Sequence, residues 1–272
     1  MSYRKNNFLS FMNRKFKQWV LSILATKKFQ PFFRKLHWIA LKGMNYGSAN
    51  SPFESGEANV LDELENELPE NPIIFDVGAN RGYYIDLVIK KWGNKNPNLH
   101  AFEPDSSCYE ILTRKYGSYN NIIFNKCALG SESGKATLYA EQEGAVNATL
   151  VESDLNTGVL TEVDVHTIDE YCLINNITTI DFLKIDTEGF EINVLKGAKE
   201  MIRKGVIHRI QLEHGSFQSI LMGASLYSYG QILKEYELFH IKQDGLFKLN
   251  VTPINEIYYN SNYFFKHKTR KR

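Results

Sequence analysis

The stretch IIFDVGANRGYYIDLVIKKW (residues 73–92) decides the fold class. Its first five residues form an apolar run that only Asp76 interrupts, which is typical of a strand buried on both faces of a sheet. GANRG (78–82) predicts a turn, and the apolar residues of 83–92 recur at helical spacing. The stretch therefore predicts a strand, a tight turn and a helix, which is the opening unit of an α/β domain.

The same alternation continues along the chain. Six further apolar segments predict strands, at 98–102, 121–125, 180–186, 206–215, 237–243 and 262–266. Helical patterns lie between most of them, at 105–116, 167–176, 188–205 and 226–236. We therefore expect a doubly wound, mostly parallel sheet of seven strands with right-handed crossovers. Two segments with alternating polarity, 135–140 and 162–167, predict a half-exposed hairpin beside that sheet.

Composition narrows the class of protein. Hydrophobic residues make up 43% of the 272 residues and charged residues 23%, which excludes disorder as the main state. No run of 18 apolar residues is present to span a bilayer. The three cysteines, Cys108, Cys127 and Cys172, form no CxxC pair, so we expect reduced thiols in the cytoplasm. The apolar run 19–25 is too short to favour a signal peptide.

Charge is distributed unevenly along the chain. Residues 1–53 contain ten Lys or Arg and no Asp or Glu, and the last seven residues add five basic side chains. The remaining 212 residues carry 17 basic and 31 acidic groups, a net charge of −14. We therefore divide the chain into a basic helical arm with its linker, residues 1–56, and a domain over residues 57–272.

The arm has an amphipathic pattern over residues 8–28. Its apolar residues recur at i, i+3 and i+4, with basic residues between them. Such a helix can lie in an anionic membrane interface, which would place the protein at the inner face of a membrane. The alternative is that the apolar stripe packs on the domain core or on a second subunit, so the sequence leaves the oligomeric state open.

Carboxylates follow the predicted strands at the edge where ligands bind in doubly wound sheets. Asp76, Glu103 and Asp186 end three strands, and Glu213 with His214 ends a fourth. The spacing of Gly78 and Gly82 departs from the three-glycine dinucleotide fingerprint, and no phosphate-binding Walker loop is present. These acidic strand ends favour a cationic ligand with a ribose diol, such as S-adenosylmethionine.

Six motifs resemble those of the FkbM family of methyltransferases. They are FDVGANRGYYIDL (75–87), HAFEPD (100–105), CALG (127–130), VHTIDEY (165–171), FLKIDTEGFEINVLKGA (182–198) and IQLEHG (210–215). The resemblance implies a class I, Rossmann-like methyltransferase fold, S-adenosylmethionine as cofactor, and O-methylation of a hydroxyl on a sugar or natural product. The family's aspartate-leucine-aspartate before the helix at 167 stands here as Thr167-Ile168-Asp169.

The resemblance also implies roles for individual residues. Asp76, Gly78, Asn80 and Gly82 would line the methionine end of the cofactor, and Glu103 would bind its ribose. Cys127, Ala128 and Leu129 would contact adenine. Asp186, with Thr187 and Glu188, would face the transferred methyl group and the acceptor.

Asp186 and His214 are the candidates for a general base, and Glu213 for a residue that orients His214. Asp186 has the alternative role of N-cap to the helix predicted at 188–205. His214 has the alternative of a structural, hydrogen-bonded histidine. Asp186, Glu188 and Glu213 could also gather around a magnesium or calcium ion, but their spacing is not diagnostic, and we assign no metal.

Three functions remain in competition. The first is an O-methyltransferase for a hydroxylated small molecule, a glycan or a lipid-linked acceptor, as in polysaccharide modification. The dense aromatic residues after 216 suit such acceptors, although core packing explains them equally well. The second is a nucleic-acid methyltransferase that uses the basic arm and tail, against which the acidic domain argues. The third is a non-catalytic adaptor at a membrane, against which the intact motif residues argue.

Overall fold

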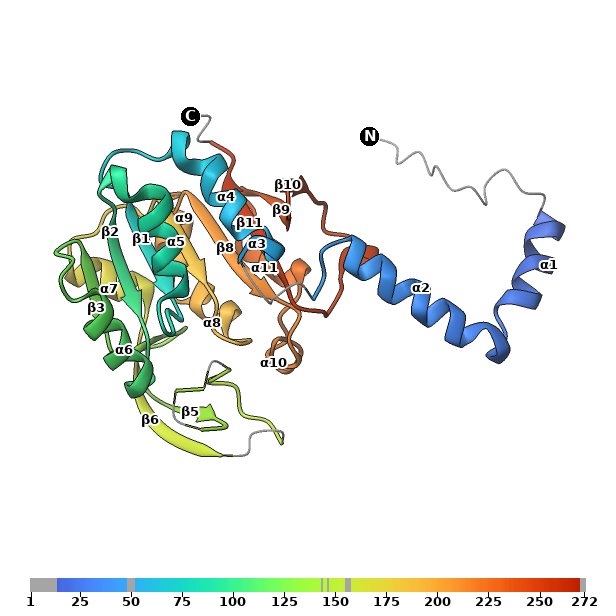
Figure 1. Cartoon of the computed structure of the whole chain (residues 1–272), viewed down its shortest axis with the longest axis horizontal. Helices are drawn as coiled ribbons and strands as arrows, with labels where there is room; N and C mark the ends of the chain where they lie inside the picture. Colours follow the sequence, from blue (N-terminus) through green and yellow to red (C-terminus); the bar gives the residue numbers. More distant parts are fainter. Residues whose placement is uncertain (1–13, 48–51, 143, 146, 155–157, 270–272) are drawn as a thin grey trace. The chain divides into compact units, whose positions relative to one another are not determined.

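A computed structural model describes residues 14–47, 52–142, 144–145, 147–154 and 158–269 (Figure 1). The chain forms two compact units that divide between Met44 and Asn45. This division precedes the boundary at residue 56 that composition suggested. The second unit already includes helices α3 (Pro52–Ser55) and α4 (Glu57–Leu64).

The first unit is helical. It contains α1 (Arg14–Leu24), a short 3-10 helix at Lys27–Phe29 and α2 (Gln30–Gly43). Several large apolar side chains are exposed, and Phe16 and Trp19 keep 52% and 58% of their surface. Residues 8–13 of the predicted amphipathic helix lie outside the described residues. No helix in the described ranges combines the length and apolar character needed to cross a membrane.

The second unit contains an eight-stranded sheet in the order β10-β9-β11-β8-β7-β1-β2-β3. The strands from β8 to β3 are parallel, and β11, β9 and β10 add on in antiparallel fashion. Their bounds are β1 Ile73–Val77, β2 Asn98–Phe102, β3 Ile122–Asn125, β7 Phe182–Ile185, β8 Arg209–His214, β9 Tyr236–Lys242, β10 Gly245–Lys248 and β11 Ser261–His267. All seven predicted strands are present. The eighth, β10, pairs with β9 across the two-residue turn Gln243–Asp244, and Asp244-Gly245 is a usual hairpin signal.

Helices cover both faces of this sheet, as expected for a doubly wound fold. One face packs on α4, α5 (Tyr83–Trp92) and α6 (Ser106–Tyr116), where Ile74 and Phe182 join the core. On the opposite face the ring of Phe75 contacts Tyr171 of α7 (Ile168–Ile174). Ile74 and Phe75 therefore serve different layers, because successive side chains of a strand alternate between faces.

A three-stranded sheet, β4-β6-β5, lies outside the main sheet (Figure 1). Its strands are β4 (Ala128–Leu129), β5 (Gly134–Ala140) and β6 (Val159–His166). β5 and β6 are antiparallel, with Gly134 opposite Val165 and Ala140 opposite Val159. The predicted hairpin is therefore present.

The prediction of a single helix over 188–205 is wrong in two respects: the helix begins later, and it is interrupted. The structure has α8 (Glu191–Lys196) and α9 (Lys199–Arg203), preceded by a turn. Glu188 and Gly189 have φ of +53° and +102°, which the right-handed helix does not allow. Phe190, and not Asp186, is therefore the N-cap residue of α8. The N-cap alternative for Asp186 is excluded by this geometry.

Gly78 allows the ends of β1 and β7 to approach each other. Its φ is +81°, and a Cβ built there would lie 1.8 Å from the carbonyl oxygen of Asp186. We expect Gly78→Ala to lower the free energy of unfolding by at least about 1–3 kcal/mol, from the strained φ alone. Gly93→Ala is the matched control, because its Cβ meets nothing within 4 Å. Chemical denaturation measures both variants, and equal effects would contradict the close approach.

Candidate active site

The acidic strand ends meet at one edge of the main sheet. β2, β1, β7 and β8 are consecutive neighbours, so their carboxyl ends lie side by side. Asp76 lies within β1, Glu103 follows β2, Asp186 follows β7 and Glu213 lies near the end of β8. The sheet order alone therefore brings together four carboxylates that are separated by up to 137 positions in the sequence.

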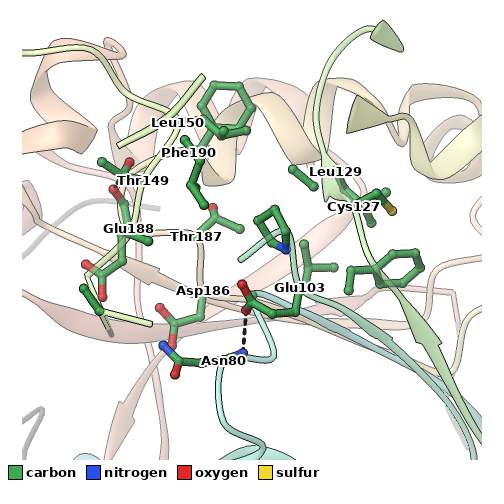
Figure 2. Close-up of a pocket in the computed structure, with 18 residues that line it drawn as sticks. Asn80, Glu103, Cys127, Leu129, Thr149, Leu150, Asp186, Thr187, Glu188 and Phe190 are labelled. Carbon is green, nitrogen blue, oxygen red and sulfur yellow. Dashed lines mark hydrogen bonds between the residues drawn. The ribbon is translucent and has the colours of Figure 1, made fainter. Parts of the chain in front are cut away.

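A pocket opens at this edge (Figure 2). The space between its lining residues amounts to about 680 Å³, including open solvent at its mouth. Nine of the residues predicted for the site line it: Gly78, Asn80, Glu103, Cys127, Ala128, Leu129, Asp186, Thr187 and Glu188. The wall also contains apolar side chains that the sequence did not indicate, namely Phe102, Leu138, Ala145, Ala148, Leu150 and Phe190.

Glu103 is held rigidly in the pocket wall. Its Oε2 accepts a hydrogen bond from the backbone N–H of Asn80 at 2.7 Å, and its Oε1 accepts one from Asp105 N–H at 2.8 Å. Burial raises the pKa of Glu103 to about 7. Each carboxylate oxygen has a second lone pair, so Glu103 can still accept hydrogen bonds from a ligand's hydroxyl groups.

Two predicted cofactor residues lie outside the pocket lining formed by the described residues. Gly82 has φ +83°, and a Cβ there would lie 2.4 Å from the Tyr116 ring, so its role is to pack against that side chain. Asp76 is only 1% exposed, and neither of its carboxylate oxygens has a hydrogen-bond partner in the described ranges. Burial raises the pKa of Asp76 to about 7, although Lys184 opposes the shift.

A buried lysine lies directly beneath the pocket. Lys184 of β7 stands opposite Asp76 in one neighbouring strand and opposite Gln211 in the other. Its ammonium donates to Asp186 Oδ2 at 2.9 Å. Burial lowers the pKa of Lys184, but Asp186, Glu57 and Asp76 more than offset this, and the net shift is upward. The lysine is therefore a fixed cation that faces three carboxylates.

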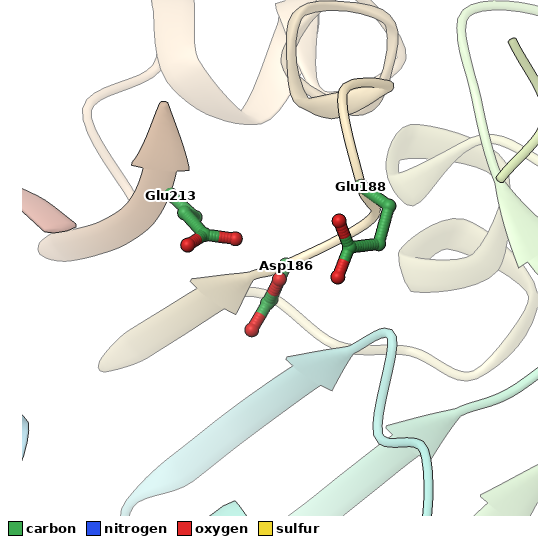
Figure 3. Close-up of side chains that lie close together, drawn as sticks. All are labelled: Asp186, Glu188 and Glu213. Carbon is green, nitrogen blue, oxygen red and sulfur yellow. The ribbon is translucent and has the colours of Figure 1, made fainter. Parts of the chain in front are cut away.

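Three carboxylates lie close together at the pocket, and two of them, Asp186 and Glu188, line it (Figure 3). One oxygen each of Asp186, Glu188 and Glu213 lies within 4.8 Å of the others. Burial, then the nearby Asp186 and Glu191, raise the pKa of Glu188 to about 8. Burial, then Asp186 and Glu188, raise the pKa of Glu213 well above its usual range. Like charges this close share protons, so this acidic centre (Asp186, Glu188, Glu213) can accept a proton near neutral pH.

His214 does not join this centre. Glu213 and His214 are consecutive residues of β8, so their side chains project from opposite faces of the sheet. His214 is buried against the rings of Tyr229, Tyr258 and Tyr263. Its Nε2 lies 3.4 Å from Glu256 Oε1. The partner of His214 is therefore Glu256, and Glu213 does not orient it.

Sequence reasoning missed Lys184, Thr149 and Glu191. A lysine inside the apolar run FLKI was a usable signal, because a buried strand tolerates a charge only when it is paired. Glu191 could have been found as the third acidic residue of DTEGFE. Thr149 gave no signal, because it comes from the segment between β5 and β6 and reaches the pocket only through the fold.

The model of the "Methyltransferase FkbM domain" matches residues 76–237, which is more than half of the chain. The chain belongs to the FkbM methyltransferase family. Membership implies S-adenosylmethionine as the cofactor of this FkbM protein, in agreement with the resemblance found in the sequence motifs.

Several relatives of this FkbM protein are known. Methyltransferase sdnD of Sordaria araneosa is 29% identical over 164 residues, which cover 49% of this chain and 62% of that protein. Hexuronic acid methyltransferase AglP of Haloferax volcanii is 28% identical over 143 residues, covering 52% and 56%. The chain thus spans about three fifths of these relatives. A methyltransferase FkbM structure from Methylobacillus flagellatus KT is 18% identical, with a TM-score of 0.46, and the match covers 75% of this chain and 50% of that one.

Proposed function

We propose that this FkbM protein is an S-adenosylmethionine-dependent O-methyltransferase that acts on a hydroxyl of a glycan or of a related small-molecule or lipid-linked acceptor. The observation that carries the proposal is the arrangement of one pocket. Its wall offers Glu103 and apolar side chains, and two members of the acidic centre, Asp186 and Glu188, line the same pocket. The name of the relative AglP, a hexuronic acid methyltransferase, supports a sugar acceptor.

The pocket residues fit the cofactor. S-adenosylmethionine supplies an electrophilic methyl group on a sulfonium. The Glu103 carboxylate suits a ribose diol, since its oxygens keep free lone pairs. The wall at Cys127, Ala128 and Leu129 is buried and mainly apolar, as an adenine ring requires. Gly78 and Asn80 would hold the methionine end, while Asp76 and Gly82 would act from behind the pocket wall.

The acidic centre has the properties of a general base for an acceptor hydroxyl. Asp186 is at once a pocket-lining residue and a member of the acidic centre. We assign to Asp186 the removal of the hydroxyl proton, with Glu188 and Glu213 sharing that proton. Base catalysis of this kind contributes about 10²–10⁴-fold to a rate. Nucleic-acid phosphates fit such a centre poorly, because three carboxylates would repel them.

The first unit supports contact with an anionic membrane. Its exposed apolar side chains include Phe16, Trp19 and Leu21 of α1. Residues 1–53 add ten basic side chains and no acidic ones, which complements anionic lipid. The three cysteines are buried free thiols, which supports a reducing compartment. We therefore propose that the protein works in the cytoplasm at the inner face of a membrane.

We expect S-adenosylhomocysteine to bind with an affinity that depends on Glu103. The ribose hydroxyls donate to the ionised carboxylate of Glu103. The affinity should therefore be highest above the Glu103 pKa of about 7, and it should fall as Glu103 takes up a proton. The dissociation constant should rise roughly tenfold between pH 8 and pH 6, and Glu103→Gln should bind weakly without this pH dependence. Calorimetric titration measures both. Glu110→Ala, at an exposed site on α6, is the control, and absence of binding by a folded sample would contradict the cofactor assignment.

We expect Asp186→Asn to lower the rate of methyl transfer by about 10²–10⁴-fold, because the amide cannot accept the hydroxyl proton. The rate is measured with methyl-labelled cofactor on an acceptor selected from neutral glycans and their lipid-linked forms. Binding of S-adenosylhomocysteine to the variant should change little, and this serves as the folding control. A variant that turns over at the wild-type rate would exclude Asp186 as the base.

We expect the full chain to sediment with anionic vesicles and not with vesicles of phosphatidylcholine alone. Substitution of both Phe16 and Trp19 by Ser should abolish this binding, and high salt should weaken it, since basic side chains supply part of the attraction. Leu160→Ser, at an exposed apolar residue of β6, is the matched control. The chain could instead sediment with neither kind of vesicle and form a dimer that the double substitution abolishes. That result would favour the alternative in which the apolar stripe packs on a second subunit.

A further inference from the structure

The turn that carries Glu188 adopts a conformation that its sequence does not favour. Glu188 and Gly189 are both in the left-handed region, with φ of +53° and +102°. Glycine accepts this conformation readily, but a glutamate does so only when its surroundings impose it. Such conformations persist at functional sites where neighbouring contacts compensate the strain. The contacts of this turn therefore indicate what keeps Glu188 in place.

Glu191 binds the turn from the first turn of α8. Its Oε1 accepts three hydrogen bonds, from Thr187 N–H at 3.0 Å, Thr187 Oγ1–H at 3.1 Å and Gly189 N–H at 3.0 Å. Glu191 is only 1% exposed, and its Oε2 has no hydrogen-bond partner in the part of the chain described. A single oxygen atom thus satisfies donors on both sides of Glu188.

Thr149 binds the same turn from the opposite side. Its Oγ1 donates a hydrogen bond to the backbone carbonyl of Glu188 at 2.9 Å. Thr149 is buried, and its own N–H and C=O pair with the backbone of Tyr139 at 2.9 and 2.8 Å. The segment between β5 and β6 therefore holds this hydroxyl in a fixed position against the turn.

Helix α10 (Phe217–Leu221) closes the remaining side. A Cβ built on Gly189 would lie 2.3 Å from the Cβ of Gln218, so the backbones of the turn and of α10 are in direct contact. Glu191, Thr149 and α10 thus all contact the backbone of the turn. The Glu188 side chain lies toward Asp186 and Glu213 (Figure 3).

We propose that Glu191 and Thr149 are positioning residues that hold Glu188 in the acidic centre. Neither residue belongs to the acidic centre itself, and both act through the backbone of 187–189. This inference rests on the proposed function, because the acidic centre has a catalytic role only if the protein transfers a methyl group. The placement of Glu188 is nevertheless measurable without any methyl transfer, so the two proposals can fail separately.

The charge and the acceptor oxygen of Glu191 can be tested separately. Glu191→Gln removes the negative charge but keeps a carbonyl oxygen for the three donors, with the amide in place of the unpartnered Oε2. Glu191→Ala removes both. The difference between the two variants therefore reports the loss of the hydrogen-bond acceptor and of the buried side chain that carries it, at equal charge.

The experiment follows the Glu188 carboxyl carbon by NMR as pH is varied, in full-length protein labelled with ¹³C-glutamate and assigned with Glu188→Gln. Four neighbours act on this titration: Asp186, Glu191, Lys184 and Glu213. In the wild type we expect a pKa of about 8 for Glu188. In Glu191→Gln it should remain well above the ordinary range.

In Glu191→Ala we expect the Glu188 pKa to fall by at least about one unit below that of Glu191→Gln, because the released turn lets the carboxylate reach solvent. Equal titrations in the two variants would overturn the role of Glu191. The control is Glu200→Ala, a substitution of an acidic residue of α9. In this variant Glu188 should titrate as it does in the wild type.

Thr149 offers an independent pair of variants if Glu191→Ala does not fold. Thr149→Ser keeps the hydroxyl that binds the Glu188 carbonyl, and Thr149→Val removes it at nearly constant volume. We expect a lowered Glu188 pKa in the valine variant and the wild-type value in the serine variant. Wild-type titration in Thr149→Val would overturn the role of Thr149.

Discussion

The site depends on one ion pair, at 2.9 Å, between the buried ammonium of Lys184 and the carboxylate of Asp186, whose side chain is 37% exposed. Lys184 is the compensating cation for Asp76 and Glu57 as well. Without Lys184 these carboxylates would lose the cation that they share, and a buried charge without a partner destabilises a fold. β7 thus places the compensating charge among the acidic strand ends.

Much of the fold followed from the sequence because its signals are local. Apolar runs and helical periodicity located all seven predicted strands. The resemblance to the FkbM motifs implied cofactor roles for Glu103, Asn80 and residues 127–129, and all of these line one pocket. The errors arose where distant contacts override local preference. The 188–205 segment is a good helix by periodicity, yet Glu191 and Gln218 favour a turn at Glu188. The apolar side chains of Ala145, Ala148 and Leu150 line the pocket from the segment between β5 and β6, which local sequence patterns did not connect with the site.

The raised pKa values of the site carboxylates also lower the free energy of unfolding at neutral pH. Asp76, Glu103 and Glu188 have raised pKa values of about 7, 7 and 8, and an unfolded chain would ionise the same groups near pH 4. The folded state therefore binds more protons than the unfolded state in this interval. The stability that these groups contribute is complete below about pH 4 and is lost as pH rises toward 8. At neutral pH these carboxylates are partly charged, and each therefore lowers the free energy of unfolding of the protein.

The hydroxyl of Thr149 joins two parts of the pocket that are otherwise separate. The segment that carries it lines the pocket with Ala148 and Leu150, and the same hydroxyl binds the carbonyl of Glu188. A molecule that shifts this segment when it binds in the pocket would also shift the backbone that carries Glu188. Such a link is reciprocal, since a ligand that changes the affinity of a second ligand is itself affected equally. Under the proposed function, the binding of the cofactor and the binding of the acceptor would then be coupled, and each would change the affinity of the other by the same factor.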